Sequence, residues 1–183
     1  MNDTTILNEM FKPNIRVHTQ DFYGRPGVVL REPLENSEMS IRHLPDDAII
    51  VNADAFPAPK SFFSGIKHEC KRADFIIISE QKKTALFIEM KKTKGEWKDI
   101  VKQLGGAACL FAYCREIGKF FWKEKDFLRD YNCRFISVGH TSIPKRKMLI
   151  ERTAACHDEP HKAERINWPN YLQYNKLIGQ AID

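Results

Sequence analysis

The sequence has no long apolar run, and this absence excludes a membrane-spanning helix. Its longest apolar stretches, Phe75 to Ile78 and Ala107 to Tyr113, are far shorter than the roughly 18 residues that cross a bilayer. The segment from Met1 to Met10 contains Asp3 and Glu9 and lacks a basic region followed by an apolar one, unlike a signal peptide. We therefore expect a cytoplasmic protein with no membrane partner.

The chain also lacks a disulfide framework and a strong charge of either sign. Its 5 cysteines are odd in number and irregularly spaced, so we expect free thiols in a reducing compartment. The net charge of +5 is compatible with phosphate binding but too small to demonstrate it. With 43% hydrophobic and 29% charged residues, the composition excludes disordered, collagen-like and coiled-coil proteins.

The length of 183 residues suits a single domain, which the patterning divides into three parts. We expect an irregular N-terminal lobe over residues 1–60, a core over 61–140 that carries the candidate catalytic residues, and a C-terminal extension over 141–183. The extension is polar and leads into a possible C-terminal helix.

The N-terminal lobe is rich in turn residues and contains two short apolar runs. Val28 to Leu30 and Ala48 to Val51 are predicted to be short strands. Asp3 or Thr4 is expected to cap a short helix that stops before Pro13.

The core has firmer patterning. Residues 75–78 and 85–88 are predicted strands, and the polar turn at 80–83 makes them a hairpin. A helix is predicted over 96–114, where apolar residues recur at helical spacing to form one buried stripe. Gly105 and Gly106 lack the context of a phosphate-binding loop and indicate close packing of this helix against the sheet.

Three further elements are expected after that helix. They are a short strand over 120–122, a brief helix over 123–131 and a strand over 133–138. The order strand, strand, helix, strand predicts an α/β fold with a mixed β-sheet flanked by helices.

The hairpin brings three charged side chains together. A turn at 80–83 pairs Ser79 with Thr84, which places Asp74 opposite Glu89 and therefore on the same face of the sheet. Strand alternation puts Lys91 on that face too. Two carboxylates that face each other repel unless a cation lies between them, and oxygen ligands suit Mg²⁺ or Mn²⁺. A nearby lysine can hold or deprotonate an attacking water and stabilise charge on a phosphate.

The motif Arg72-Ala73-Asp74, fourteen residues and then Ile88-Glu89-Met90-Lys91 resembles the PD-(D/E)xK nuclease superfamily. Members share a restriction-endonuclease-like core, with the Asp on the second core strand and Glu-x-Lys on the third, followed by a helix and another strand. The resemblance covers about residues 66–138 and implies that Asp74 and Glu89 bind metal while Lys91 is catalytic. Ala73 stands where the motif has proline, a departure that is common in the family.

Glu-x-Lys alone has little specificity, since it also occurs at 69–71, 80–82 and 96–98. The strand end, the matched Asp74 and the following helix distinguish Glu89. The structural alternative is a solvated salt-bridge cluster of Asp74, Glu89 and Lys91.

Other residues are candidates for supporting roles. Many family members place a glutamine on the following helix, which implies a role for Gln103, although Ala107 stands where a tyrosine sometimes follows. A hydrogen bond at the flank of the helix is an equally good interpretation of Gln103. The family often supplies a further acid from a helix before the sheet, and both Glu9 and Glu69 are candidates. Possible phosphate contacts are Lys71, Arg72, Lys145, Arg146 and Lys147.

A zinc site is a weaker alternative, because the cysteines and histidines near the C-terminus contain no C-x-x-C pair. Its possible ligands are Cys133, His140, Cys156, His157 and His161.

These features predict a Mg²⁺- or Mn²⁺-dependent nuclease that cleaves DNA, most simply an endonuclease of restriction, repair or phage-defence type. RNA is the alternative substrate. The alternative function is a catalytically silent nuclease-fold module that binds nucleic acid or a partner protein. The chain has little sequence for a separate recognition domain, so specificity is expected from a homodimer or from an ATPase or helicase partner.

Overall fold

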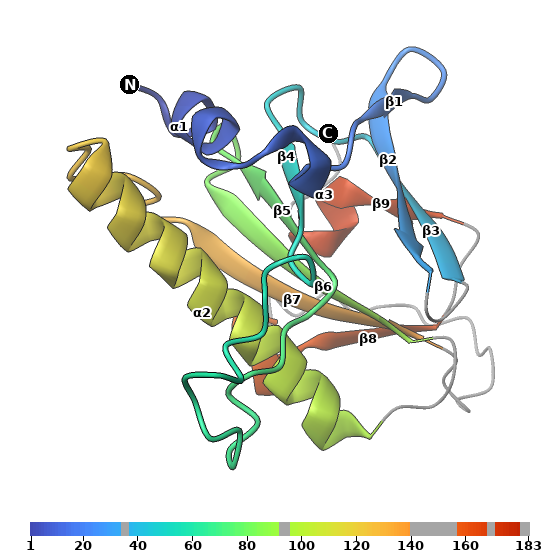
Figure 1. The fold of residues 1–183 in the computed structure, drawn as a ribbon. Helices are drawn as coiled ribbons and strands as arrows, with labels where there is room; N and C mark the ends of the chain where they lie inside the picture. The colour runs from blue at the N-terminus through green and yellow to red at the C-terminus, as the bar shows by residue number, and fades with distance from the viewer. Residues whose placement is uncertain (34–36, 92–95, 140–156, 168–170, 180–183) are drawn as a thin grey trace.

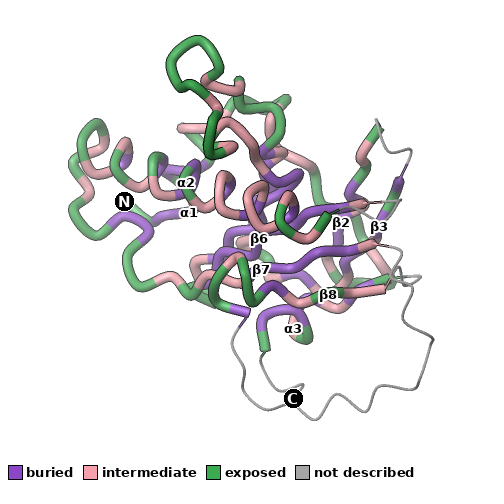
Figure 2. The backbone as a smooth tube through the Cα atoms, turned by 90° about the horizontal axis from the view of Figure 1, so that it is seen from below, coloured by how far each residue is buried: buried purple, intermediate pink, exposed green. Residues whose placement is uncertain are grey.

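A five-stranded mixed sheet forms the centre of the protein in the computed structural model, which describes residues 1–33, 37–91, 96–139, 157–167 and 171–179 (Figure 1). Its strands, in spatial order, are β4 (Ile49–Asn52), β5 (Phe75–Ser79), β6 (Thr84–Lys91), β7 (Asn132–Gly139) and β8 (Glu164–Asn167). The pairs β4–β5 and β5–β6 are antiparallel, whereas β6–β7 and β7–β8 are parallel. β6 lies at the centre and is buried over nearly its whole length, and residues 135–138 of β7 are buried beside it (Figure 2).

A second sheet covers one face of the first. It consists of β1 (Gln20–Asp21), β2 (Pro26–Glu32), β3 (Ser37–Arg42) and β9 (Leu172–Gln173), and the helix α3 (Tyr174–Leu177) follows directly. Alternate residues of β2 and β3 pack with alternate residues of β5 and β6 in a common apolar core: Val28, Leu30, Met39, Ile41, Phe75, Ile77, Leu86 and Ile88. This layer explains why both faces of the β5–β6 hairpin are apolar.

The long helix α2 (Trp97–Phe121) covers the opposite face of the main sheet (Figure 1). Its apolar stripe packs on the other set of alternate residues, which includes Ile76, Ile78, Phe87 and Phe135. The helix α1 (Asp3–Met10) packs into the same core, and short 3-10 helices occur at Pro13–Ile15 and Pro160–Lys162. Among the described residues, none of the helices is both long and apolar enough to span a bilayer.

Several predictions for the central part are confirmed. The protein is mixed α/β, and the β5–β6 ladder pairs Ser79 with Thr84 and Phe75 with Ile88, as the turn at 80–83 requires. The predicted strand over 133–138 is β7. The close approach at Gly106 is also real, because a Cβ there would lie 1.7 Å from the carbonyl oxygen of Lys71. Its partner is the segment that leads into β5 rather than the sheet itself.

The prediction for residues 120–131 is wrong. α2 continues to Phe121, beyond the expected end at residue 114, so no strand forms over 120–122. The helix can continue because Gly118 has no side chain where the ring of Phe127 lies, 2.0 Å from the position of a Cβ. Residues 123–131 form turns rather than a helix, and Lys123 and Leu128 adopt positive φ angles that interrupt helical geometry.

The N-terminal helix is confirmed but its predicted cap is wrong. Asn2, and neither Asp3 nor Thr4, accepts the capping hydrogen bond, from the N–H of Thr5 at 2.8 Å. The Asp3 carboxylate is buried and accepts a hydrogen bond of 2.9 Å from the Tyr131 hydroxyl instead. The Asp3 side chain, which the local pattern predicted to cap the helix, therefore binds Tyr131, 128 residues away.

The two ends of the chain contribute more regular structure than the sequence indicated. The strand predicted near residues 48–51 is β4 of the main sheet, and the lobe also contains β3, which the sequence analysis did not predict. The C-terminal extension supplies β8 to the main sheet and β9 to the second sheet, before the expected helix α3.

Candidate metal and active site

Asp74 immediately precedes β5 and is held by contacts to β6 and to the residue that follows β4. Its N–H donates to the carbonyl oxygen of Ile88 at 3.2 Å, and its own carbonyl oxygen accepts from the N–H of Ala53 at 2.8 Å. The Asp74 Oδ2 atom accepts a hydrogen bond of 2.6 Å from the N–H of Met90. The bonds to Ile88 and Met90 lie on either side of Glu89 along β6, so Asp74 lies beside Glu89 as predicted.

Glu89 is a completely buried acid, with 0% of its surface exposed. Like Phe87, it points to the α2 face of β6, which is the face that strand alternation also gives to Lys91. The Lys91 Nζ atom lies 3.0 Å from Glu89 Oε1 and is itself partly exposed. No described residue forms a hydrogen bond with Glu89 Oε2, which leaves a buried polar atom unsatisfied.

Burial raises the pKa of both acids. Desolvation is the largest cause of the raised pKa of Glu89, and the negative charge of Asp74 raises it further while Lys91 opposes the shift. For Asp74, desolvation again dominates; the charges of Glu32 and Asp54 add to it, and the Met90 N–H and Lys91 partly offset it. The site therefore holds more acid than one lysine neutralises.

These residues fit a hard divalent cation. Mg²⁺ characteristically binds one or two protein carboxylates and completes its coordination with water and phosphate oxygens. Within the described ranges, no cluster of three or more His, Cys, Asp or Glu side chains is placed to hold a metal. A site of two acids, one with an unsatisfied buried oxygen, matches Mg²⁺ or Mn²⁺ better than a cation that needs a full protein cage.

The structure gives different contacts for the other predicted site residues. Gln103 is half-buried on α2 and its side chain forms no hydrogen bond with the described residues, so its role stays a prediction. Lys71 forms an ion pair of 2.8 Å with Asp99 on α2. Arg72 is mostly buried and contacts Asp54 at 3.3 Å, which anchors the loop after β4. The remaining candidates, Lys145, Arg146 and Lys147, lie outside the described residues.

Neither acid proposed as a third metal ligand is directed to the site. Glu9 accepts a hydrogen bond of 2.8 Å from Trp122, just beyond the C-terminal end of α2. Glu69 is tied to its own loop, where the N–H groups of Gly65 and Lys67 each donate to it at 2.9 Å. These local hydrogen bonds also lower the pKa of Glu69.

Two acids near the site, Glu32 and Asp54, were missed by the sequence analysis, and Asp54 acts on both site acids. Asp54 follows β4 at the end of the sheet where Asp74 precedes β5, and its charge raises the pKa of both Asp74 and Glu89. The signal in the sequence was an acid placed three residues after the apolar run at 48–51. Using that signal required knowing that this strand is the neighbour of β5.

The zinc alternative gains no support in the described part of the chain. His157 is buried and its Nε2 atom forms a hydrogen bond with the carbonyl oxygen of Leu177, which links the start of this segment to α3. His140 and Cys156 lie outside the described residues. The imidazole of His157 thus has a structural partner.

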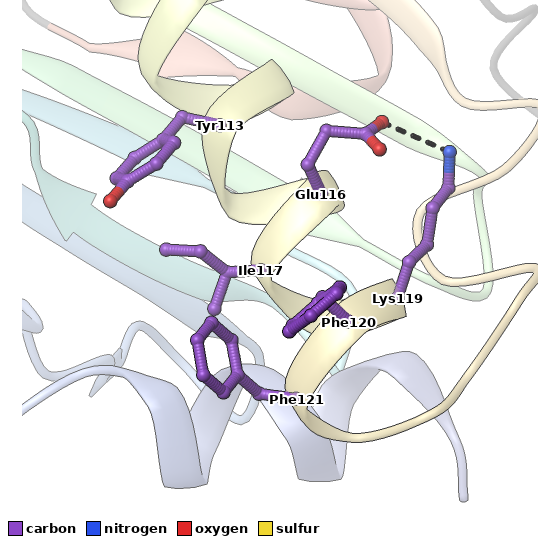
Figure 3. A pocket seen from close by; sticks show the side chains of 6 residues that line it. All are labelled: Tyr113, Glu116, Ile117, Lys119, Phe120 and Phe121. Carbon is purple, nitrogen blue, oxygen red and sulfur yellow. Dashed lines mark hydrogen bonds and ion pairs between the residues drawn. The ribbon is translucent and has the colours of Figure 1, made fainter.

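A surface hollow near the C-terminal end of α2 is separate from the acid pair (Figure 3). Tyr113, Ile117, Phe120 and Phe121 supply its apolar lining, and the two phenylalanines are largely exposed. Its charged residues neutralise each other, because Lys119 Nζ lies 3.0 Å from a Glu116 carboxylate oxygen. This hollow presents no group with evident catalytic chemistry.

Comparisons with family models, with curated proteins and with solved structures find no match to this chain. The residues of the acid pair, their burial and the strands that position them are therefore the basis for assigning a function.

Proposed function

We propose that this protein is a Mg²⁺-dependent nuclease that hydrolyses phosphodiester bonds in DNA. The observation that carries this proposal is the buried Glu89 carboxylate, which has an unsatisfied oxygen, beside Asp74 and within 3.0 Å of Lys91. Without a cation, this arrangement combines desolvation of two acids with their mutual repulsion. A divalent cation bound by both carboxylates would offset this desolvation and repulsion, and it would supply the chemistry of phosphodiester hydrolysis.

The order of the elements supports the resemblance to the PD-(D/E)xK superfamily. Asp74 immediately precedes β5, Glu89 and Lys91 lie on β6, and α2 connects β6 to the parallel strand β7. This is the order of second strand, third strand, helix and further strand that the resemblance implies. The alternative of a solvated salt-bridge cluster is less consistent with the burial of Asp74 and Glu89, which are 7% and 0% exposed.

Each residue has a distinct role in the proposed reaction. Asp74 and Glu89 would hold the cation, and Asp74 offers Oδ1, because its Oδ2 atom is bonded to the Met90 N–H. The bound metal would polarise a phosphate oxygen and make a coordinated water more acidic. The Lys91 ammonium would donate hydrogen bonds to the attacking water and to a phosphate oxygen, and so favour the added negative charge at phosphorus.

Cleavage of supercoiled plasmid and linear duplex DNA, with Mg²⁺ or Mn²⁺ and with a chelator, tests the proposal. We expect metal-dependent cutting that falls at least about a hundredfold in Asp74→Asn and Glu89→Gln, since metal ligation supplies several kcal/mol to the transition state. The matched control is Glu38→Gln, because Glu38 is an exposed acid of β3 that forms an ion pair with Arg31.

Three results would contradict the proposal: no cutting by the wild type, cutting that continues in the chelator, or equal cutting by the wild type and both site variants. If the wild type binds DNA in the first case, the silent binding module becomes the better assignment. A parallel assay on an RNA strand distinguishes the two substrates.

A further inference from the structure

The register of the main sheet aligns the acid pair with an arginine two strands away. Glu89 on β6 pairs with Ser137 on β7, and Ser137 pairs with Arg165 on β8. This row crosses β6, β7 and β8, and Asp74, which immediately precedes β5, lies beside its Glu89 end. The row faces α2, because Phe87 and Phe135, two positions earlier on their strands, pack in the core beneath that helix.

Arg165 is held by an aromatic ring and not by an acid. Its guanidinium carbon lies 3.7 Å from the centre of the Trp97 ring, a distance typical of a cation–π contact. The side chain is exposed, and no described acid forms an ion pair with it. The arginine is therefore oriented while its hydrogen-bond donors stay available for a ligand.

The position of Trp97 makes an anionic ligand the expected partner of this arginine. Trp97 is the first residue of α2, so Arg165 lies at the positive end of a helix of 25 residues. A cation is unfavourable there unless an anion lies between it and the helix terminus. Asp99, the acid of the first helical turn, already forms an ion pair with Lys71 at 2.8 Å.

We propose that Arg165 binds a phosphate of the DNA backbone next to the phosphate at Asp74 and Glu89, with Trp97 orienting the guanidinium. Two strand spacings separate Arg165 from Glu89 in the row, roughly 10 Å between backbones. A planar guanidinium can donate two hydrogen bonds to one phosphate. This inference rests on the proposed nuclease function and assigns β8 a substrate-binding role.

Binding and cleavage assays together test the role of Arg165. Binding is measured by fluorescence anisotropy of a labelled DNA duplex, in an Asp74→Asn plus Glu89→Gln background that prevents cutting, over a range of salt concentrations. Arg165→Ala and Arg165→Lys are compared with Arg25→Ala. Arg25 is an exposed arginine in the turn between β1 and β2 and serves as the matched charge control. Cleavage is measured with the same substitutions in the wild-type background.

If the proposal is correct, Arg165→Ala raises the Kd on the order of tenfold, as loss of one charge-assisted contact predicts. The slope of log K against log salt decreases in magnitude by about one. Arg165→Lys should recover the salt slope but only part of the affinity, because lysine retains the charge and loses the stacked plane. Arg25→Ala should reproduce neither large change.

The proposal is overturned if Arg165→Ala and Arg25→Ala give the same Kd and salt slope while the wild type still cuts DNA. That result would leave the nuclease function in place. A wild type that neither binds nor cuts DNA with Mg²⁺ or Mn²⁺ overturns the nuclease function and the role of Arg165 together. Circular dichroism of each variant excludes misfolding as the cause of a loss.

Discussion

The Asp74 carboxylate accepts a hydrogen bond of 2.6 Å from the backbone N–H of Met90, the residue after Glu89. The Asp74 side chain is thus bound to β6, the strand that carries Glu89. This bond fixes Asp74 beside Glu89 without any cation and leaves Asp74 Oδ1 for a ligand. The site is therefore organised in the absence of metal, an arrangement that would favour tight binding of the proposed cation.

Metal binding should stabilise the wild-type protein. At a Mg²⁺ or Mn²⁺ concentration about 100 times the Kd, linkage predicts roughly 2.7 kcal/mol of added stability. For a chain of 183 residues, this corresponds to an increase in Tm on the order of 5–10 °C. Thermal unfolding with and without metal measures it. Glu89→Gln should lose the increase and Glu38→Gln should keep it; an equal increase in all three proteins would contradict the predicted site.

The metal-free protein should lose stability as pH rises from about 4.3, the pKa of an unfolded glutamate, to about 8, the pKa of buried Glu89. Burial raises the folded-state pKa of Glu89 above the value in the unfolded chain, so the folded state binds more protons between those two values. The penalty is absent below the unfolded pKa of about 4.3 and complete above the folded one. Glu89→Gln removes it.

The variant should therefore match the wild type near pH 4 and become more stable than it toward neutral pH, by on the order of 2 kcal/mol. Urea unfolding in a chelator at several pH values measures the difference. A difference that does not change with pH would show that Glu89 titrates normally.

Lys91→Gln should separate metal binding from catalysis. The two acids stay in place, so Mg²⁺ should still raise the Tm, whereas cleavage should fall by at least about a hundredfold because Lys91 no longer stabilises charge at the phosphate. Thermal unfolding and plasmid cleavage provide the two measurements. If the variant cuts DNA as fast as the wild type, Lys91 has no catalytic role and serves only as a counter-ion to Glu89.

Two adjacent glycines of α2 should respond in opposite ways to alanine. A Cβ at Gly106 would lie 1.7 Å from the Lys71 carbonyl oxygen, so Gly106→Ala must displace the segment that leads to Asp74. We expect a loss of about 2–4 kcal/mol in unfolding free energy, together with weaker metal binding. Gly105 has no heavy atom within 4 Å of that position, and Gly105→Ala should add about 0.5–1 kcal/mol through helix propensity. Equal effects would disprove the close packing.

Asp54 should strengthen metal binding through its charge. Asp54→Asn removes a negative charge that acts on both site acids, and we expect the Kd for Mg²⁺ to rise between about two- and tenfold. High salt should reduce this difference. The control is Asp46→Asn, which removes the same charge at the opposite end of β4, because Asp46 precedes the strand whereas Asp54 follows it. Isothermal titration calorimetry that shows equal affinities for both variants would exclude a contribution from Asp54.

The grouping of Asp74, Glu89 and Lys91 in the candidate site could be predicted from the sequence because all three lie in or next to one hairpin. The turn at 80–83 fixes which residues of β5 and β6 face each other, and strand alternation then places Glu89 and Lys91 on one face. Arg165 could not be found in the same way, because its position depends on a parallel pairing with β7 across a long stretch of sequence. The strand predicted over 120–122 is wrong because of a tertiary contact that the local pattern does not show. The ring of Phe127 lies over Gly118 and allows α2 to continue.

The mixed topology of the sheet also has a consequence for how the protein folds. The β5–β6 hairpin joins neighbouring residues and can form early, whereas the β6–β7 and β7–β8 pairings close much longer loops. In a hairpin that forms alone, Asp74 and Glu89 are still hydrated and carry ordinary acidities. In the folded protein, α2 and β7 exclude that water, so the acid pair acquires its raised pKa values only when the whole sheet is assembled.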